Sequence, residues 1–267
     1  MLSQAEKANI FQTLHHEGTF VMANFWDTGS AVILENLGFK ALASTSAGYA
    51  QSIGKLDSQI TLEEKLRHLS EVCARTSAPI NADFEHGFAD TAEGAAENLL
   101  RAAEAGVVGL SIEDWSRNEI YDKEEATDRI QACVEAKNKF DFPFTLTARS
   151  EVILRRTGDL DEAISRLLAY EAAGADVLYA PGLANEAQIK TVKEAVNKPI
   201  NVLFAFMPQM PLGKYQALKV NRISLGSALA NRSIAATLDA ANSMLNDGDF
   251  AWGADIVGGK VLNKLLG

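Results

Sequence analysis

Residues 104–114 of the chain read EAGVVGLSIED, a stretch in which a helical pattern ends at Gly106 and a β-rich run begins at once. The same joint recurs at Gly38 (NLGFKAL) and at Gly174 (AAGADVL), where a glycine in the left-handed conformation would cap the helix. This weak internal repeat predicts helices that return directly into strands, which is the order of elements in a β/α fold.

Short β-rich runs alternate with longer segments of helical period through the whole sequence, and eight such runs are present. Eight βα units in one chain predict the α/β class and a closed parallel (β/α)8 TIM-type barrel. An open doubly wound sheet would need about six or seven strands and a phosphate-binding glycine turn, and no such glycine motif follows any run. The runs lie at 19–24, 41–44, 79–83, 107–112, 144–148, 176–179, 199–203 and 220–224.

The composition is that of an ordinary soluble globular protein, with 267 residues, 47% of them hydrophobic and 22% charged. The net charge of -10 and the lack of a Lys/Arg block argue against nucleic acid or an anionic membrane as partner. The longest apolar run, at 202–207, is far short of the roughly 18 to 20 residues of a membrane span, and the first residues show no signal-peptide pattern. With only Cys73 and Cys133 and no expected disulfide, the sequence predicts a cytoplasmic protein.

No linker divides the chain, because the prolines and glycines are spread among the joints, so residues 1–267 are predicted to form a single β/α barrel domain. Residues 226–267 would be a C-terminal helical extension that begins with one long amphipathic helix at 226–246. After eight strands are used, the apolar residues of this tail must pack outside the barrel or on another subunit. The tail therefore predicts a homo-oligomer.

Carboxylates follow the second, third and fourth runs, at the end of a barrel where active sites are built. Asp57, Asp83, Glu85 and Glu113 would then concentrate negative charge at one mouth. Oxygen ligands without a Cys or His set suit Mg²⁺ or Mn²⁺. The alternative is that these acids are solvated loop residues or helix caps.

Three other features of the predicted mouth suit an anionic substrate. Arg149 directly follows the fifth run and could clamp a carboxylate or phosphonate, or form an ion pair with Glu151. The small residues STSAG at 44–48 could bring backbone N–H groups to an anion, or form a simple turn. Asn201 lies in the seventh run and is included with Thr45, Ser46 and Ala47 as a predicted substrate-binding residue.

His86 is the one histidine near the predicted carboxylate cluster, in the stretch DFEHGF, and is a candidate acid–base group. His15, His16 and His68 fall on helical segments, so we expect them on the surface or on a helix face. The two cysteines fall in helical segments as well and are interpreted as packing residues.

The motifs that contain these residues resemble those of the isocitrate lyase and phosphoenolpyruvate mutase superfamily, and the resemblance runs along nearly the whole sequence. The resemblance implies a β/α barrel that forms a tetramer or a dimer of dimers, with the last helices passing between neighbouring subunits. It also implies a Mg²⁺ ion that holds a 2-oxo acid or its enolate through two oxygens. The motifs that carry it are residues 24–57, PINADFEHGF at 79–88, EAGVVGLSIED at 104–114, LTARSE at 146–151, residues 166–183, PINVL at 199–203 and RISLGSAL at 222–229.

Transferred position by position, the resemblance assigns roles to the candidate residues. It makes Asp83 the direct metal ligand, with the other three carboxylates, Asp57, Glu85 and Glu113, holding the waters of the metal. Residues 45–47 would receive the substrate carboxylate on their backbone. Arg149 would bind the same end of the substrate or the opposite one.

The sequence departs from the isocitrate and methylisocitrate lyases after the fourth run. Those lyases carry a lysine, cysteine, glycine and histidine run there, whereas residues 115–125 read WSRNEIYDKEE. Authentic isocitrate or methylisocitrate cleavage is therefore not expected, and Arg117 and Asn118 become the candidate catalytic residues of a gating loop. The resemblance then implies a Mg²⁺-dependent carbon–carbon lyase of small 2-oxo or 2-hydroxy dicarboxylates such as oxaloacetate. Two alternatives remain: phosphorus–carbon chemistry on phosphonopyruvate or carboxyphosphonoenolpyruvate, as in a mutase or hydrolase, and a non-catalytic carboxylate-binding protein.

Overall fold

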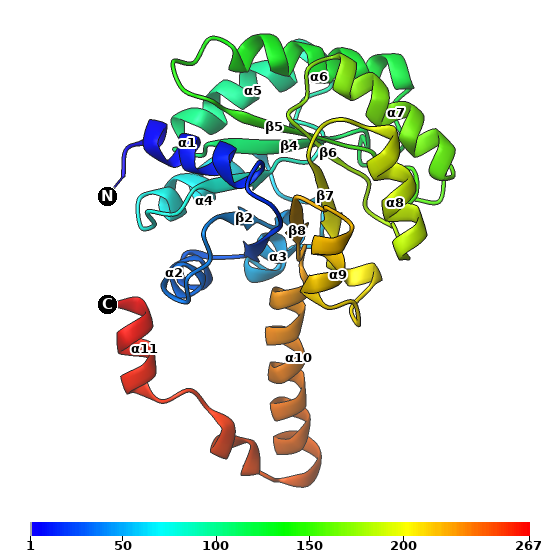
Figure 1. The fold of residues 1–267 in the computed structure, drawn as a ribbon. Coiled ribbons are helices and arrows are strands. Elements are labelled where there is room, and N and C mark those ends of the chain that lie inside the picture. Colours follow the sequence, from blue (N-terminus) through cyan, green and yellow to red (C-terminus); the bar gives the residue numbers. More distant parts are fainter. Residues whose placement is uncertain (1) are drawn as a thin grey trace.

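The computed structural model describes residues 2–267 and shows eight parallel strands that close into a barrel, with β8 beside β1 (Figure 1). The predicted (β/α)8 barrel is confirmed. Each strand falls within or beside one predicted run, and its ends differ from the prediction by two residues at most. The strands are β1 (Phe20–Phe25), β2 (Leu42–Ser44), β3 (Ile80–Asp83), β4 (Gly109–Glu113), β5 (Thr145–Arg149), β6 (Val177–Tyr179), β7 (Ile200–Leu203) and β8 (Arg222–Ser224).

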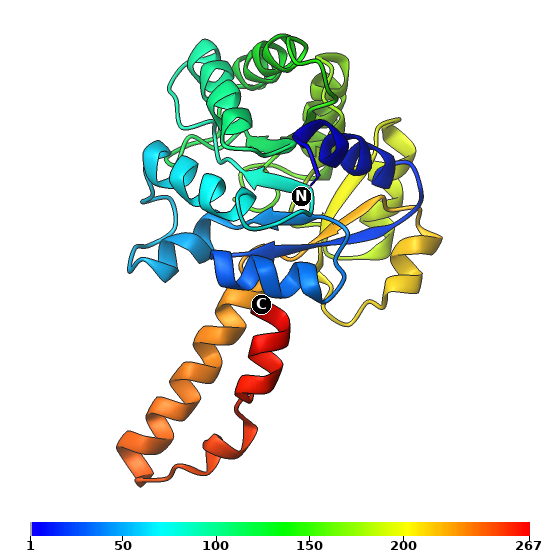
Figure 2. The same ribbon diagram turned by 90° about the vertical axis from the view of Figure 1, so that its left-hand side faces the viewer.

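Helices follow the strands and cover the outside of the barrel, while α1 (Gln4–Leu14) packs at its N-terminal end (Figures 1 and 2). There Phe11 of α1 is buried in a cluster with Met22 and Val108. None of the helices in residues 2–267 is both long and apolar enough to cross a membrane. The remaining helices of the barrel are α2 (Thr28–Asn36), α3 (Ser46–Ser52), α4 (Leu62–Cys73), α5 (Ala92–Glu104), α6 (Lys123–Lys137), α7 (Leu160–Ala172), α8 (Glu186–Ala195), the short 3₁₀ turn Phe204–Phe206 and α9 (Leu212–Ala217).

The three glycine joints have the predicted conformation. Gly38, Gly106 and Gly174 have φ angles of +100°, +101° and +101°, in the left-handed region that a side chain would disfavour. At Gly106 a Cβ atom would also lie 2.9 Å from the Cβ of Cys73, so helix α4 packs directly against this joint.

Side chains along each strand alternate between the barrel interior and the surrounding helices. On β3 and β4 the outward residues Ala82, Leu110 and Ile112 belong to the main apolar core. Most inward positions are polar, and with the apolar Met22 and Ala43 they line a small interior cavity below the mouth. Its polar residues include Asn81, Asp83, Ser111, Arg149, Asn201, Arg222 and Ser224. The interior of this barrel therefore continues the polar character of its mouth.

The C-terminal segment forms an arm that leads away from the barrel and turns back (Figures 1 and 2). Helix α10 (Ala228–Asn242) ends in a π-helical turn at Ser243–Asp247, and α11 (Gly259–Leu266) returns to α2, where the Asn36 side-chain amide donates to the carbonyl of Leu265 at 2.9 Å. The helix predicted at 226–246 is thus α-helical only as far as Asn242. Large apolar residues on the arm remain exposed: Leu238, Leu245, Phe250, Trp252, Ile256, Val257, Val261, Leu262 and Leu266.

Of the histidines expected on the surface or on a helix face, His16 is exposed, whereas His68 lies on the inner face of α4 and His15 lies at the buried C-terminal end of α1. His15 and His68 are buried, with 3% and 2% of their surface exposed. The ring of His68 stacks on Tyr49 at 3.9 Å, and His15 packs edge-on against Phe11. Imidazole rings are therefore buried against apolar side chains in this protein, and the helical pattern of the sequence does not show which histidines are buried.

Candidate active site

A cavity of about 170 Å³ lies at the C-terminal ends of the strands and collects most of the predicted site residues. Asp83, Glu113 and Arg149 end three consecutive strands, and the β4–β5 register pairs Glu113 with Arg149. The residues that line the cavity are Thr45, Ser46, Ala47, Asp57, Ser58, Asp83, Glu85, Glu113, Arg149, Arg155, Tyr179, Leu203, Gly226 and Ser227.

Arg149 lies among three carboxylates at the base of this cavity. Its Nε donates to Glu151 Oε1 at 2.6 Å, and its Nη1 lies 3.2 Å from Glu113 Oε2 and 3.5 Å from Asp83 Oδ1. The guanidinium also lies over the ring of Tyr179, 5.2 Å from its centroid. The ion pair of Arg149 with Glu151 is confirmed, and the role of Arg149 as a clamp for a substrate anion stays a prediction.

Asp83 is held by hydrogen bonds with the segment that joins β2 to α3, at Ser44 and Ser46. The Ser46 amide donates to Asp83 Oδ2 at 2.9 Å and the Ser46 hydroxyl to the Asp83 carbonyl at 3.0 Å. Ser44 Oγ accepts from the Asp83 amide, and fully buried Lys65 donates to the hydroxyl oxygens of Ser44 and Ser46 at 2.9 and 3.4 Å. Lys65 was not found from the sequence, because it lies in the middle of a helical pattern with nothing to mark its buried ammonium.

Most backbone N–H groups of the predicted anion-binding segment, residues 45–47, already donate hydrogen bonds within the protein. The Thr45 amide donates to the Phe25 carbonyl and the Ser46 amide to Asp83, while Thr45 Oγ1 caps α3 by accepting from the Gly48 amide. Within residues 2–267 the amide of Ala47 is therefore the one donor among these three that has no such partner. A substrate carboxylate could reach the chain there.

Glu85 and Arg117 form an ion pair at the edge of the site, 2.8 Å apart. Both have left-handed backbones, with φ of +48° and +80°, a conformation that costs energy for residues with a side chain and persists where the surroundings enforce it. Arg117 also lies over the Phe88 ring. Glu85 Oε1 is buried without a hydrogen-bond partner in the described chain, so this oxygen is free to accept from a water or to meet a cation.

The carboxylates of the cavity are electrostatically strained. Burial raises the pKa of Glu113 well above its usual value of 4.5, against the lowering effect of Arg149, and burial likewise raises the pKa of Glu85 and of Asp57. A carboxyl with a raised pKa keeps its proton more strongly in the folded chain than in the unfolded one. Stability therefore falls as the pH rises from the unfolded pKa towards the folded one.

This donor set fits a hydrated divalent cation. A cation would neutralise the crowded acids and give the unpartnered Glu85 Oε1 a water to bind. Within residues 2–267, no group of three or more His, Cys, Asp or Glu side chains is arranged to hold a metal ion by itself. The assignment of Asp83 as the metal ligand, with Asp57, Glu85 and Glu113 holding the waters of the metal, stays a prediction.

Four predicted residues do not line this cavity: His86, Arg117, Asn118 and Asn201. His86 lies with Arg117 in a separate cavity of about 310 Å³, and burial together with Arg117 and Arg129 lowers the pKa of His86 to about 4, so its ring is neutral at pH 7. Asn118 is exposed. Asn201 lies below the mouth, where its side chain bonds Ser224 and Arg222 rather than facing the main cavity.

Arg155 lines the cavity and was missed by the sequence analysis. Its Nε lies 2.9 Å from Glu151 Oε2, and its guanidinium lies 4.5 Å from the centroid of the Trp115 ring. It therefore ties the segment after β5 to the loop that follows β4, which an antiparallel bridge between Trp115 and Ile120 closes. Its position six residues past the strand placed it outside the strand-end positions that the sequence singled out.

Comparison with protein families gives one match that covers most of the chain: residues 11–245 match the phosphoenolpyruvate phosphomutase family. An uncharacterized protein of Mycobacterium tuberculosis is 30% identical over 242 residues, which are 90% of each chain. The oxaloacetate decarboxylase of Rhodopseudomonas palustris is 29% identical over 222 residues, 76% of this chain and 71% of that enzyme.

Among solved structures, a candidate lyase/mutase from Burkholderia cenocepacia has 43% sequence identity and a TM-score of 0.94, covering 98% of this chain and 95% of that one. A phosphonopyruvate hydrolase in complex with oxalate and Mg²⁺ has a TM-score of 0.85 at 22% identity, covering 97% of this chain and 94% of that one. The second similarity is one of fold alone.

Proposed function

Because the chain belongs to the phosphoenolpyruvate phosphomutase family, we propose that it is a Mg²⁺-dependent lyase of a small 2-oxo or 2-hydroxy dicarboxylate, with oxaloacetate-like acids as leading substrates. One observation carries the proposal: Arg149, Arg155 and the Ala47 amide face the same small cavity as Asp83, Glu85 and Glu113. Anion-binding and cation-binding groups are thus side by side. A relative named oxaloacetate decarboxylase supports the choice of substrate class.

The residues of the chain bind and orient the substrate in this proposal. Arg149 already meets three carboxylates at 2.6 to 3.5 Å, so a substrate carboxylate would take over part of its donor set, and Glu113 would be among the residues that hold the hydrated metal. Tyr179 and Leu203 supply apolar walls that limit the length of the substrate and exclude water. When bound at Asp83, Mg²⁺ supplies Lewis-acid stabilisation of the negative charge that develops on the 2-oxo oxygen.

A panel of substrates assayed with Mg²⁺ tests the proposal. Release of pyruvate from oxaloacetate or a substituted malate supports carbon–carbon cleavage, with Asp83→Asn as the inactive control. Interconversion or hydrolysis of phosphonopyruvate would support the phosphorus–carbon alternative instead. Tight oxalate binding without any turnover would identify a carboxylate-binding protein and refute the lyase.

For the exposed apolar residues of the arm, we propose a second copy of this chain as the partner. Trp252 is 39% exposed and Phe250 66% exposed, on an arm that returns to the barrel where α11 packs against α2. Large exposed apolar patches of this kind mark protein contacts. Light scattering on the full chain would test the homodimer or tetramer.

A further inference from the structure

Arg222 of β8 is a buried cation with only neutral partners. It is 1% exposed inside the barrel, where Nε donates to Asn201 Oδ1 at 3.0 Å and Nη2 to Thr147 Oγ1 at 3.0 Å. Nη1 lies 3.3 Å from His15 Nε2. Within residues 2–267, no Asp or Glu oxygen forms a salt bridge with this guanidinium.

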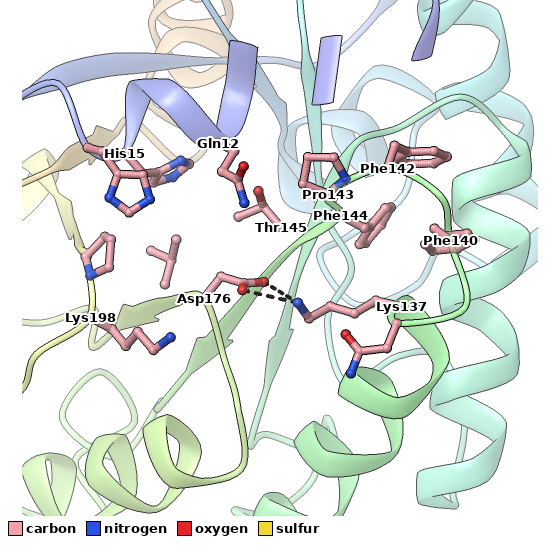
Figure 3. A pocket seen from close by; sticks show the side chains of 14 residues that line it. Gln12, His15, Lys137, Phe140, Phe142, Pro143, Phe144, Thr145, Asp176 and Lys198 are labelled. Atoms are coloured by element: carbon pink, nitrogen blue, oxygen red, sulfur yellow. Dashed lines mark hydrogen bonds and ion pairs between the residues drawn. The ribbon is translucent and has the colours of Figure 1, made fainter. Parts of the chain in front are cut away.

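The N-terminal end of the barrel closes over Arg222 without balancing its charge. His15 Nδ1 lies 2.8 Å from the Phe11 carbonyl and must donate to it, so Nε2 carries the lone pair that faces Arg222. Burial, with a smaller effect of Arg222, lowers the pKa of His15 to about 3, so the ring is neutral. Figure 3 shows His15 at one wall of the open cavity of about 350 Å³ at this end, so a neutral ring separates that cavity from the guanidinium.

The opposite side of Arg222 faces the active site. A cavity of about 40 Å³, large enough for a water molecule, is lined by Arg222, Asp83, Arg149 and Tyr179. Asn81 Oδ1 borders it and is buried without a hydrogen-bond partner in the described chain, which points to a bound water. Only this small polar space therefore separates the unpaired charge from the carboxylate proposed to hold the metal.

An unpaired buried charge lowers stability, and the three neutral side chains that contact Arg222 give it hydrogen bonds but no counter-charge. We propose that Arg222 is a positioning residue of the active site, a buried counter-charge that favours the anionic substrate over the free metal ion. The inference rests on the proposed function, because it requires that the mouth binds a small carboxylate. It predicts opposite effects on the two ligands: without the charge, the anion binds more weakly and the cation does not.

Calorimetric titration of Arg222→Gln with Mg²⁺ alone, and then with oxalate in saturating Mg²⁺, tests the proposal. We expect oxalate affinity to fall about tenfold and Mg²⁺ affinity to stay the same or rise, since an effective interaction of about 1.4 kcal/mol gives a factor of ten. Arg222→Lys keeps the charge and should recover most of the oxalate affinity. Thr147→Val is the matched control, because it removes one hydrogen bond of Arg222 but leaves the charge.

Other outcomes overturn the proposal. Unchanged oxalate affinity in Arg222→Gln, or a parallel loss of both affinities that Arg222→Lys does not restore, would make Arg222 structural. Arg222→Met is the second neutral variant, and if both neutral variants fail to fold while the lysine variant folds, the charge serves the barrel and not the site. If the wild-type protein itself binds no oxalate, the proposed function fails rather than the role of Arg222.

Discussion

Replacing Arg149 by lysine keeps a positive charge among the acids of the mouth but removes the planar donor. In the structure two different nitrogens serve two carboxylates, Nε for Glu151 at 2.6 Å and Nη1 for Glu113 at 3.2 Å. An ammonium group is a single point and cannot hold Glu151 while it binds a substrate carboxylate. We expect the loss of one charge-assisted hydrogen bond, about 1.5–3 kcal/mol, which lowers kcat/KM about 10- to 150-fold.

The matched variant Arg149→Met separates the catalytic from the structural contribution. It would leave Glu113, which is 7% exposed, without its cation, and Glu151, which is 0% exposed, with Arg155 as its only remaining cation in the described chain, at a cost of about 3–5 kcal/mol of stability. At about 2–4 °C per kcal/mol for a domain near this size, its Tm should fall by about 6–20 °C. Arg149→Lys keeps the charge balance, so its Tm should stay within a few degrees of wild type.

The assay is kcat/KM on the best substrate of the panel, measured with Tm and Mg²⁺ affinity on the same preparations. If the lysine variant melts as early as the methionine variant, its lost activity reflects damage to the fold, and Arg149 holds Glu151 rather than the substrate. Wild-type kcat/KM in the lysine variant would refute the two-pronged role outright.

Four further outcomes are expected. Asp83→Asn should abolish Mg²⁺ binding and activity while Tm is kept or raised, because it relieves like-charge crowding; unchanged Mg²⁺ affinity in calorimetry would remove Asp83 from the site. Glu113→Gln should raise the Tm of the metal-free protein at pH 7 and flatten its fall above pH 4.5, since burial raises the pKa of Glu113; equal Tm–pH profiles would contradict this. Deleting residues 248–267 should give smaller species or aggregates in light scattering, and a monomeric full-length chain at micromolar concentration would refute the proposed interface. In the proposed gating loop, Arg117→Ala should lower turnover while Mg²⁺ affinity is retained, because the variant removes the ion pair that joins the loop to Glu85. Asn118→Ala should have a weak effect because Asn118 is exposed, and unchanged kinetics in both variants would show that the loop is only a connector.

Sequence reasoning succeeded where short-range patterns control structure. A glycine followed by a β-rich run needs only local backbone preferences, and Gly38, Gly106 and Gly174 have the φ angles that those preferences demand. Asp83, Glu113 and Arg149 were found because a parallel barrel places all its strand ends at one mouth. Position along a strand therefore locates these side chains without knowledge of their partners.

Side chains beyond the strand ends depend on contacts that the sequence does not specify. His86 lies one residue after Glu85, yet the left-handed backbone of Glu85 turns the chain so that His86 lines another cavity. Asn118 points to solvent because Arg117, its neighbour, pairs with Glu85. Lys65 resembles any surface lysine of an amphipathic helix, and only the tertiary fold brings its ammonium from α4 to Ser44 at the end of β2.

Yet one signal for the interior was present in the strands. Polar residues recur at every second position, as Asn81 with Asp83 on β3 and Arg222 with Ser224 on β8, while the residues between them are apolar. In a closed barrel that alternation leaves the polar series inside, because the outward series must pack on helices. An arginine in such a series is therefore confined to the barrel interior, away from bulk water and from the acids on the outer faces of the helices. Its charge can be balanced along the barrel axis, and in this protein Asp57, Asp83, Glu85 and Glu113 lie at one end of that axis, in the active-site mouth, whereas Asp176 at the other end is paired with Lys137.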